Sequence, residues 1–136
     1  MAIRVVSAES MEIRGSDDIV LVRQAVRRKS VALGFGLVDQ TKVVTASSEL
    51  ARNTLDYGGG GKAHLELVEN GTRSGLRVTF EDQGPGIPDL DLALTDGYTT
   101  GNGMGLGLSG AKRLSHEFEL WSKPGEGTRV TILRWK

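Results

Sequence analysis

Two polar residues, Glu49 and Asn53, stand four positions apart in a segment whose apolar residues recur at helical spacing. Residues four apart lie on one face of an α-helix, and the apolar residues of this segment gather on the opposite face. An amide oxygen is a suitable Mg²⁺ ligand, and a nearby carboxylate can take a proton from an attacking hydroxyl. Taken alone, the pair fits a solvated helix surface better than a catalytic site, so its meaning depends on the glycine motifs that follow.

The first glycine motif, residues 82–88, begins with Asp82 and contains Gly84 and Gly86. Alternation along the preceding segment places Asp82 on the same face as Phe80, toward an apolar interior. A carboxylate buried there needs a hydrogen-bond donor, and the exocyclic amine of adenine is a donor of the right kind. A strand that ends in a tight Gly/Pro turn, with Asp82 as a local cap, explains the same residues equally well.

The second motif, residues 101–108, has glycine at four alternate positions and opens a predicted helix. Glycines let backbone N–H groups approach an anion closely, and a helix N-terminus favours phosphate. The motif lacks the Gly-Lys-Ser/Thr ending of the Walker loop, and its spacing differs from the dinucleotide fingerprint. A mobile connector is the alternative interpretation.

The third motif, residues 125–128, ends in Thr128. Alternation places Thr128 on the face of Val130 and Ile132, so its hydroxyl is predicted to face the same interior as Asp82. A simple hairpin turn followed by a β-branched residue is the more ordinary explanation of this motif by itself.

The elements that must position these motifs follow from periodicity and turn residues. We expect one or two strands over 3–7 and 11–14, a helix capped by Ser16 that runs from 19 to about 33, and a helix from 39 to about 57. A hairpin that turns at Asn70-Gly71 comes next, then an irregular region from 83 to 102. A third helix begins at 105–107, and a closing hairpin turns at Pro124-Gly125. Hairpins and helices segregate along the chain, which predicts an α+β fold.

Composition narrows the function classes. The 136 residues suit one domain, 1–136, and the 17 basic and 17 acidic residues give no net charge, so neither nucleic acid nor a membrane surface is an expected partner. No segment approaches the ~20 apolar residues of a membrane span. The chain has no cysteine, which suits a reducing cytosol.

The helix pair and the three glycine motifs, in this order, resemble the nucleotide-binding boxes of the GHKL (histidine kinase-like) ATPase and kinase superfamily. This resemblance implies a Bergerat-type two-layer α/β sandwich with a mostly antiparallel sheet, which holds ATP and Mg²⁺ beneath a lid at 89–102. It assigns the adenine amine to Asp82 with support from Thr128, contact with the base to Ile87, and Mg²⁺ to Asn53. The remaining nucleotide contacts that it implies are Gly84, Gly86, Gly103, Gly105, Leu106, Gly107 and Leu108.

Three segments, 33–40, 48–53 and 81–88, resemble more narrowly the RsbT-like switch kinases of the bacterial stressosome. That resemblance implies a protein serine/threonine kinase with Glu49 as base, STAS-domain partners, and activation of a PP2C-type phosphatase. The longer superfamily members carry a transducer domain, which we do not expect in this protein. A nucleotide-gated binding module without phosphate transfer is the main alternative. An ATP-binding fragment of a histidine kinase is a third, although neither His64 nor His116 fits the phosphorylated position.

Overall fold

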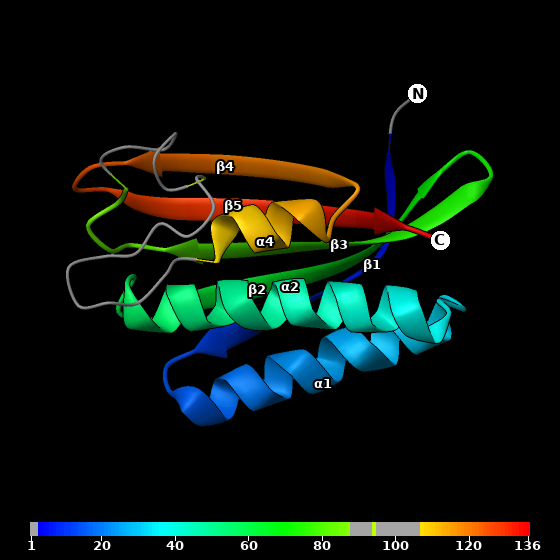
Figure 1. Ribbon diagram of the computed structural model, residues 1–136, viewed down its shortest axis with the longest axis horizontal. Helices are drawn as coiled ribbons and strands as arrows, with labels where there is room; N and C mark the ends of the chain where they lie inside the picture. Colours follow the sequence, from blue (N-terminus) through cyan, green and yellow to red (C-terminus); the bar gives the residue numbers. More distant parts are fainter. Residues whose placement is uncertain (1–2, 88–93, 95–106) are drawn as a thin grey trace.

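The computed structural model describes residues 3–87, 94 and 107–136. Within them, five antiparallel strands form one sheet in the order β1-β2-β3-β5-β4 (Figure 1). Their bounds are β1 Arg4–Ile13, β2 Gly61–Asn70, β3 Arg73–Asp82, β4 Glu117–Lys123 and β5 Gly127–Trp135. The α+β sandwich expected from the segregation of helices and hairpins is confirmed.

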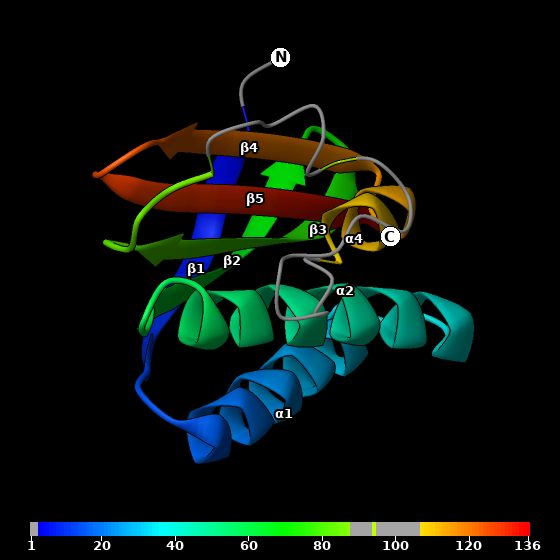
Figure 2. The ribbon, with the colours of Figure 1, turned by 60° about the vertical axis from the view of Figure 1, so that its left-hand side comes forward.

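In the described part of the chain, three helices cover one face of this sheet: α1 (Ser16–Ala32), α2 (Leu37–Asp56) and α4 (Leu108–Arg113) (Figure 2). The long helix α2 packs against α1 and α4 and also contacts β3. Alternate residues of β2, β3 and β5 point toward the helices, where side chains such as Leu65, Phe80 and Ile132 are almost completely buried. Burial of these apolar faces fixes α2 along the sheet, and α2 carries the polar pair Glu49 and Asn53.

The N-terminal segment forms one strand, which is one of the two outcomes expected from the sequence. The single strand β1 spans both short segments, because it pairs with β2 along its length with an irregularity between Val5 and Ser7. Nearly all of β1 is exposed, so its residues show no clear alternation of burial.

The start of each long helix differs from prediction. Helix α1 begins at Ser16, and Gly15 is the N-cap instead of Ser16. The Asp18 carboxylate caps the N-terminal end of α1 by accepting hydrogen bonds from the N–H groups of Arg14 and Gly15, at 2.8 and 3.3 Å. Helix α2 begins at Leu37, two residues before the expected start. The earlier start of α2 does not change which face of that helix is polar.

The last strand is tied to the start of α2 by an ion pair. Arg134, only 8% exposed, donates to the Asp39 carboxylate and, at 2.9 Å, to the carbonyl of Leu114. The hydrogen bond from Arg134 holds the pKa of Asp39 below its ordinary value of 3.8. The two layers are therefore joined by a charge-assisted contact at the end of the molecule away from the Gly58–Asp82 end.

This ion pair predicts a specific pH dependence. Because the folded-state pKa of Asp39 is lowered, its ionised form stabilises the protein above the ordinary value of 3.8, and the contribution is lost as the pH falls through the lowered pKa. We expect Asp39→Asn to lower the thermal unfolding midpoint near neutral pH and to approach wild type at acidic pH. Thermal unfolding at a series of pH values measures this, with the exposed Glu119→Gln as control. A difference that persists unchanged at acidic pH would contradict the assignment.

Within the described residues, no helix combines the length and apolar character needed to cross a membrane.

Candidate functional site

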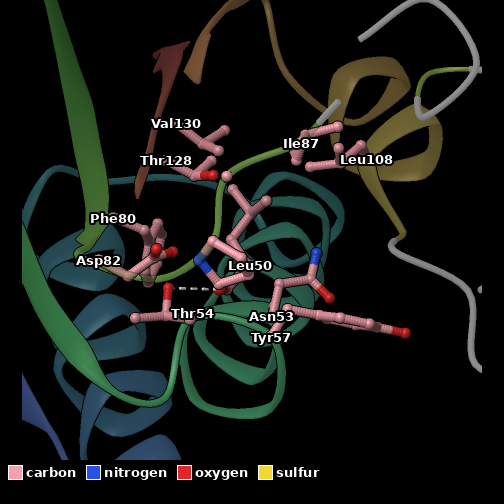
Figure 3. A pocket seen from close by; sticks show the side chains of 13 residues that line it. Leu50, Asn53, Thr54, Tyr57, Phe80, Asp82, Ile87, Leu108, Thr128 and Val130 are labelled. Carbon is pink, nitrogen blue, oxygen red and sulfur yellow. Dashed lines mark hydrogen bonds between the residues drawn. The ribbon is translucent and has the colours of Figure 1, made fainter. Parts of the chain in front are cut away.

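A pocket opens between α2 and the end of the sheet formed by β3 and β5 (Figure 3). Its cavity volume is about 50 Å³, so the side chains of the described residues line a narrow pocket. Helix α2 supplies one wall and the sheet supplies the other. The lining residues are Leu50, Asn53, Thr54, Tyr57, Gly58, Phe80, Asp82, Pro85, Gly86, Ile87, Leu108, Thr128 and Val130.

Asp82, the last residue of β3, is the carboxylate of this pocket. The backbone N–H of Gly84 donates to its Oδ1 at 2.9 Å, so the local cap considered from the sequence does form. Burial raises the pKa of Asp82, while hydrogen bonds from the backbones of Gly84 and Thr128 oppose that rise. The carboxylate is thus held in place by main-chain donors and still faces the pocket, as the alternation along β3 predicts.

The loop after Asp82 is fixed to the hairpin between β4 and β5. The N–H of Gly125 donates to the carbonyl of Pro85 at 2.8 Å. Gly86 has φ +78°, and a Cβ there would collide with the carbonyl of Lys123. Position 86 therefore requires glycine both for its backbone conformation and for this close approach.

Thr128 lies directly across from Asp82 in the β3–β5 register and lines the same pocket. Its predecessor Gly127 has φ +120°, and a Cβ at that position would collide with the backbone of Asp82. The third glycine motif thus brings β5 close enough to β3 to place Thr128 beside Asp82. Alternation predicted this shared face.

The polar pair of α2 lies at the other side of the pocket. Asn53 is half-buried and lines it, and Glu49 is exposed one turn earlier. Gly107, with φ +67°, precedes α4, and a Cβ on it would lie 2.7 Å from Oε2 of Glu49. The Glu49 carboxylate therefore lies beside Gly107 in the second glycine motif, whose last residue, Leu108, also lines the pocket.

Part of the predicted site falls outside the described residues. Gly103, Gly105 and Leu106 lie there, as does the expected lid at 89–102 apart from residue 94. The two histidines are both engaged elsewhere: His64 contacts Ser10 and Glu81, and His116 accepts the N–H of Trp135. Within the parts of the chain that the structure describes, no three His, Asp or Glu side chains cluster to hold a metal ion.

Sequence reasoning missed two residues of the site, Gly58 and Ser122. Gly58 lies in the segment between α2 and β2, and its backbone packs against the Asp82 carboxylate and Gly84. Ser122 of β4 lies opposite Thr128 in the hairpin and hydrogen-bonds to it at 2.9 Å. The closing hairpin register could have indicated Ser122, whereas the contact of Gly58 spans 24 residues of sequence and left no local signal.

Gly58 gives a test of the pocket geometry. A Cβ at position 58 would collide with the Asp82 carboxylate, so Gly58→Ala should displace that group. We expect loss of nucleotide affinity of at least about tenfold, as for one disrupted hydrogen-bonded contact. Equilibrium binding of a fluorescent adenine nucleotide measures it. Gly36→Ala is the matched control, because a Cβ there meets nothing within 4 Å. Equal affinity of both variants would contradict the placement of Asp82.

Comparison with known proteins gives a consistent picture. Residues 38–136 match the family model of histidine kinase-, DNA gyrase B- and HSP90-like ATPases. A curated relative, the serine/threonine-protein kinase RsbT of Bacillus subtilis (strain 168), is 48% identical over 118 residues, which cover 87% of this chain and 89% of the relative. An anti-sigma F factor of Thermoanaerobacter sp. (strain X514) is 30% identical over 98 residues, or 68% of each chain.

The fold is shared with a solved structure of low sequence identity. The structure of the RsbU and RsbW domains of Rv1364c from Mycobacterium tuberculosis superposes with a TM-score of 0.67 at 18% identity, covering 96% of this chain and 33% of that longer chain. At this identity the likeness establishes the fold alone. The similarity in sequence, by contrast, extends through Glu49, Asp82 and Thr128, which all fall inside the matched family region.

Proposed function

The chain belongs to the histidine kinase-, DNA gyrase B- and HSP90-like ATPase family, and we propose that it is a protein serine/threonine kinase of a bacterial partner switch. It transfers the γ-phosphate of ATP to a serine or threonine hydroxyl of a STAS-domain protein. One observation carries the proposal: the Glu49 carboxylate lies beside Gly107, at the edge of a pocket whose far end holds Asp82. The proton acceptor, Glu49, and the carboxylate that binds adenine, Asp82, thus lie at opposite ends of one site.

The inner end of the pocket receives adenine. Asp82 accepts a hydrogen bond from the exocyclic amine, and Thr128 stands beside it in register. Gly84 and Gly86 let the backbone of the loop lie close to the ligand, and Ile87 provides apolar contact with the base. Apolar lining with a few placed polar groups is what a nucleotide-base site requires.

The outer end receives the phosphates. Gly103, Gly105, Leu106, Gly107 and Leu108 supply backbone contacts from the second glycine motif. The half-buried carboxamide of Asn53 is the Mg²⁺ ligand, which fits a metal that takes few protein oxygens and completes its shell with phosphate and water. When bound, Mg²⁺ neutralises charge on the β- and γ-phosphates.

The transfer step needs one proton acceptor. The partner hydroxyl oxygen bonds to the γ-phosphorus while the bond from that phosphorus to the β–γ bridging oxygen breaks, and ADP leaves. The hydroxyl proton passes to the Glu49 carboxylate. Because phosphoryl transfer has a loose transition state, positioning by the glycine backbone and Asn53 contributes more than covalent chemistry.

Partner proteins are part of this function. Relatives named as a serine/threonine-protein kinase and as an anti-sigma F factor support a role in cytoplasmic regulation of a sigma factor. We propose STAS-domain antagonist and scaffold proteins as substrates and a PP2C-type phosphatase as a further partner. The alternative, nucleotide-gated capture of a scaffold or phosphatase without transfer, uses the same pocket but has no use for Glu49.

A pull-down combined with labelling separates the two functions. A tagged STAS protein is incubated with this chain and either γ-labelled ATP or a non-hydrolysable analogue. A kinase labels the STAS protein with ATP, and the partner-bound fraction falls once transfer is complete. Stable capture with both nucleotides and no label on the partner would instead support the binding module.

A further inference from the structure

One hydroxyl in β4, that of Ser122, joins three segments around the inner end of the pocket. Its Oγ accepts the backbone N–H of Ile87 at 2.7 Å, donates to the carbonyl of Gly127 at 3.0 Å, and lies 2.9 Å from Oγ1 of Thr128. Ser122 itself is absent from the pocket wall. Ser122 must therefore act on a ligand indirectly, through the residues to which it is hydrogen-bonded.

The proton of this hydroxyl can be assigned by counting donors. A serine hydroxyl has one proton and two acceptor positions. The Gly127 carbonyl can only accept, so it takes the Ser122 proton, and the Ile87 N–H can only donate, so it occupies one acceptor position. The contact with Thr128 must then use the second acceptor position. Thr128 consequently donates its own proton to Ser122, away from the pocket.

The orientation of the Thr128 hydroxyl fixes the polarity of the pocket end. With its proton directed at Ser122, Thr128 offers only lone pairs to a ligand. Asp82, across from it in register, is also an acceptor, and the N–H groups of Gly84 and Thr128 that touch it are already engaged. The Asp82–Thr128 end therefore favours a base edge that carries hydrogen-bond donors.

From this arrangement we infer that Ser122 is a specificity-determining residue, which makes the site select a 6-amino purine over a 6-oxo purine. The inference rests on the proposed binding of ATP. Adenine presents an amine at this edge, whereas the 6-oxo group of hypoxanthine or guanine would set a third acceptor against the acceptors of Asp82 and Thr128. Without Ser122, the Thr128 hydroxyl could rotate and donate to a 6-oxo group.

The test compares ATP with ITP, which replaces the 6-amino group by an oxo group without adding the 2-amino group of GTP. Equilibrium binding of both nucleotides is measured for the wild type, Ser122→Ala, Ser122→Thr and Ser115→Ala. Ser115 is a suitable control, since its hydroxyl is half-buried and donates only to Ala111 within α4 and its following turn. We expect the wild type to prefer ATP by at least about tenfold, as one unpaired polar contact would give.

The ratio of the ATP affinity to the ITP affinity distinguishes a role in base specificity from a purely structural role. Ser122→Ala should reduce this ratio by at least about fivefold. The ratio should stay at the wild-type value in Ser122→Thr, which retains a hydroxyl, and in Ser115→Ala. If Ser122→Ala weakens ATP and ITP by equal factors, Ser122 has a structural role and the inference is wrong. If the wild type binds ITP as tightly as ATP, the inference is wrong whatever the variants show. A wild type that binds neither nucleotide overturns the proposed function itself.

Discussion

Asp82→Asn is expected to weaken ATP binding by about 100-fold, the equivalent of ~3 kcal/mol for a charge-assisted hydrogen bond that is lost and a donor that is left unpaired. Both backbone donors at this position, from Gly84 and Thr128, need acceptors. An asparagine offers one oxygen and one NH₂ group. Its NH₂ group must therefore face either a backbone N–H or the adenine amine, and each contact sets donor against donor.

Calorimetric titration with ATP measures this loss, and the thermal unfolding midpoint checks that the variant is folded. Glu81→Gln is the matched control, because the neighbouring carboxylate contacts His64 instead of lining the pocket. ATP affinity close to wild type in Asp82→Asn would mean that the base is recognised elsewhere.

Glu49→Gln should lower the rate of phosphate transfer by at least about 100-fold, the lower end of what a general base contributes. Glutamine keeps the size of the side chain and its place beside Gly107 but cannot take the hydroxyl proton. ATP affinity should stay within about twofold, because Glu49 is absent from the pocket lining.

Single-turnover transfer to a STAS partner, measured beside ATP titration, separates the rate from the affinity. Asp56→Asn is the control, since Asp56 is an exposed carboxylate two turns further along α2. Transfer by Glu49→Gln at the wild-type rate would remove Glu49 from the mechanism and leave positioning alone to explain catalysis.

Local patterns predicted much of this fold and site. Period two along β3 and β5 was enough to place Asp82 and Thr128 on the helix-covered face, and helical spacing was enough to put Glu49 and Asn53 together. These predictions held because burial on one face imposes the periodicity on each element separately. The choice between one strand and two in the N-terminal segment could not be made, because β1 is exposed and has no such pattern.

Contacts between distant segments could not be predicted in this way. The packing of Gly58 against Asp82 depends on where α2 ends relative to β3, which only the assembled sheet and helix layer determine. The role of Ser122 depends on the register of β4 with β5 and on the loop from 83 to 87 folding back onto both. Each of these residues looked like an ordinary turn glycine or strand serine by itself.

The chemical nature of the transferred phosphate tests the central claim most directly. A STAS protein labelled by this chain with γ-labelled ATP should retain its phosphate in acid and lose it in alkali, and partial hydrolysis should yield phosphoserine or phosphothreonine. A label that is lost in acid and survives in alkali would show a phosphohistidine and contradict the account. Failure of any label to reach the partner, under conditions where ATP is bound, would contradict it equally.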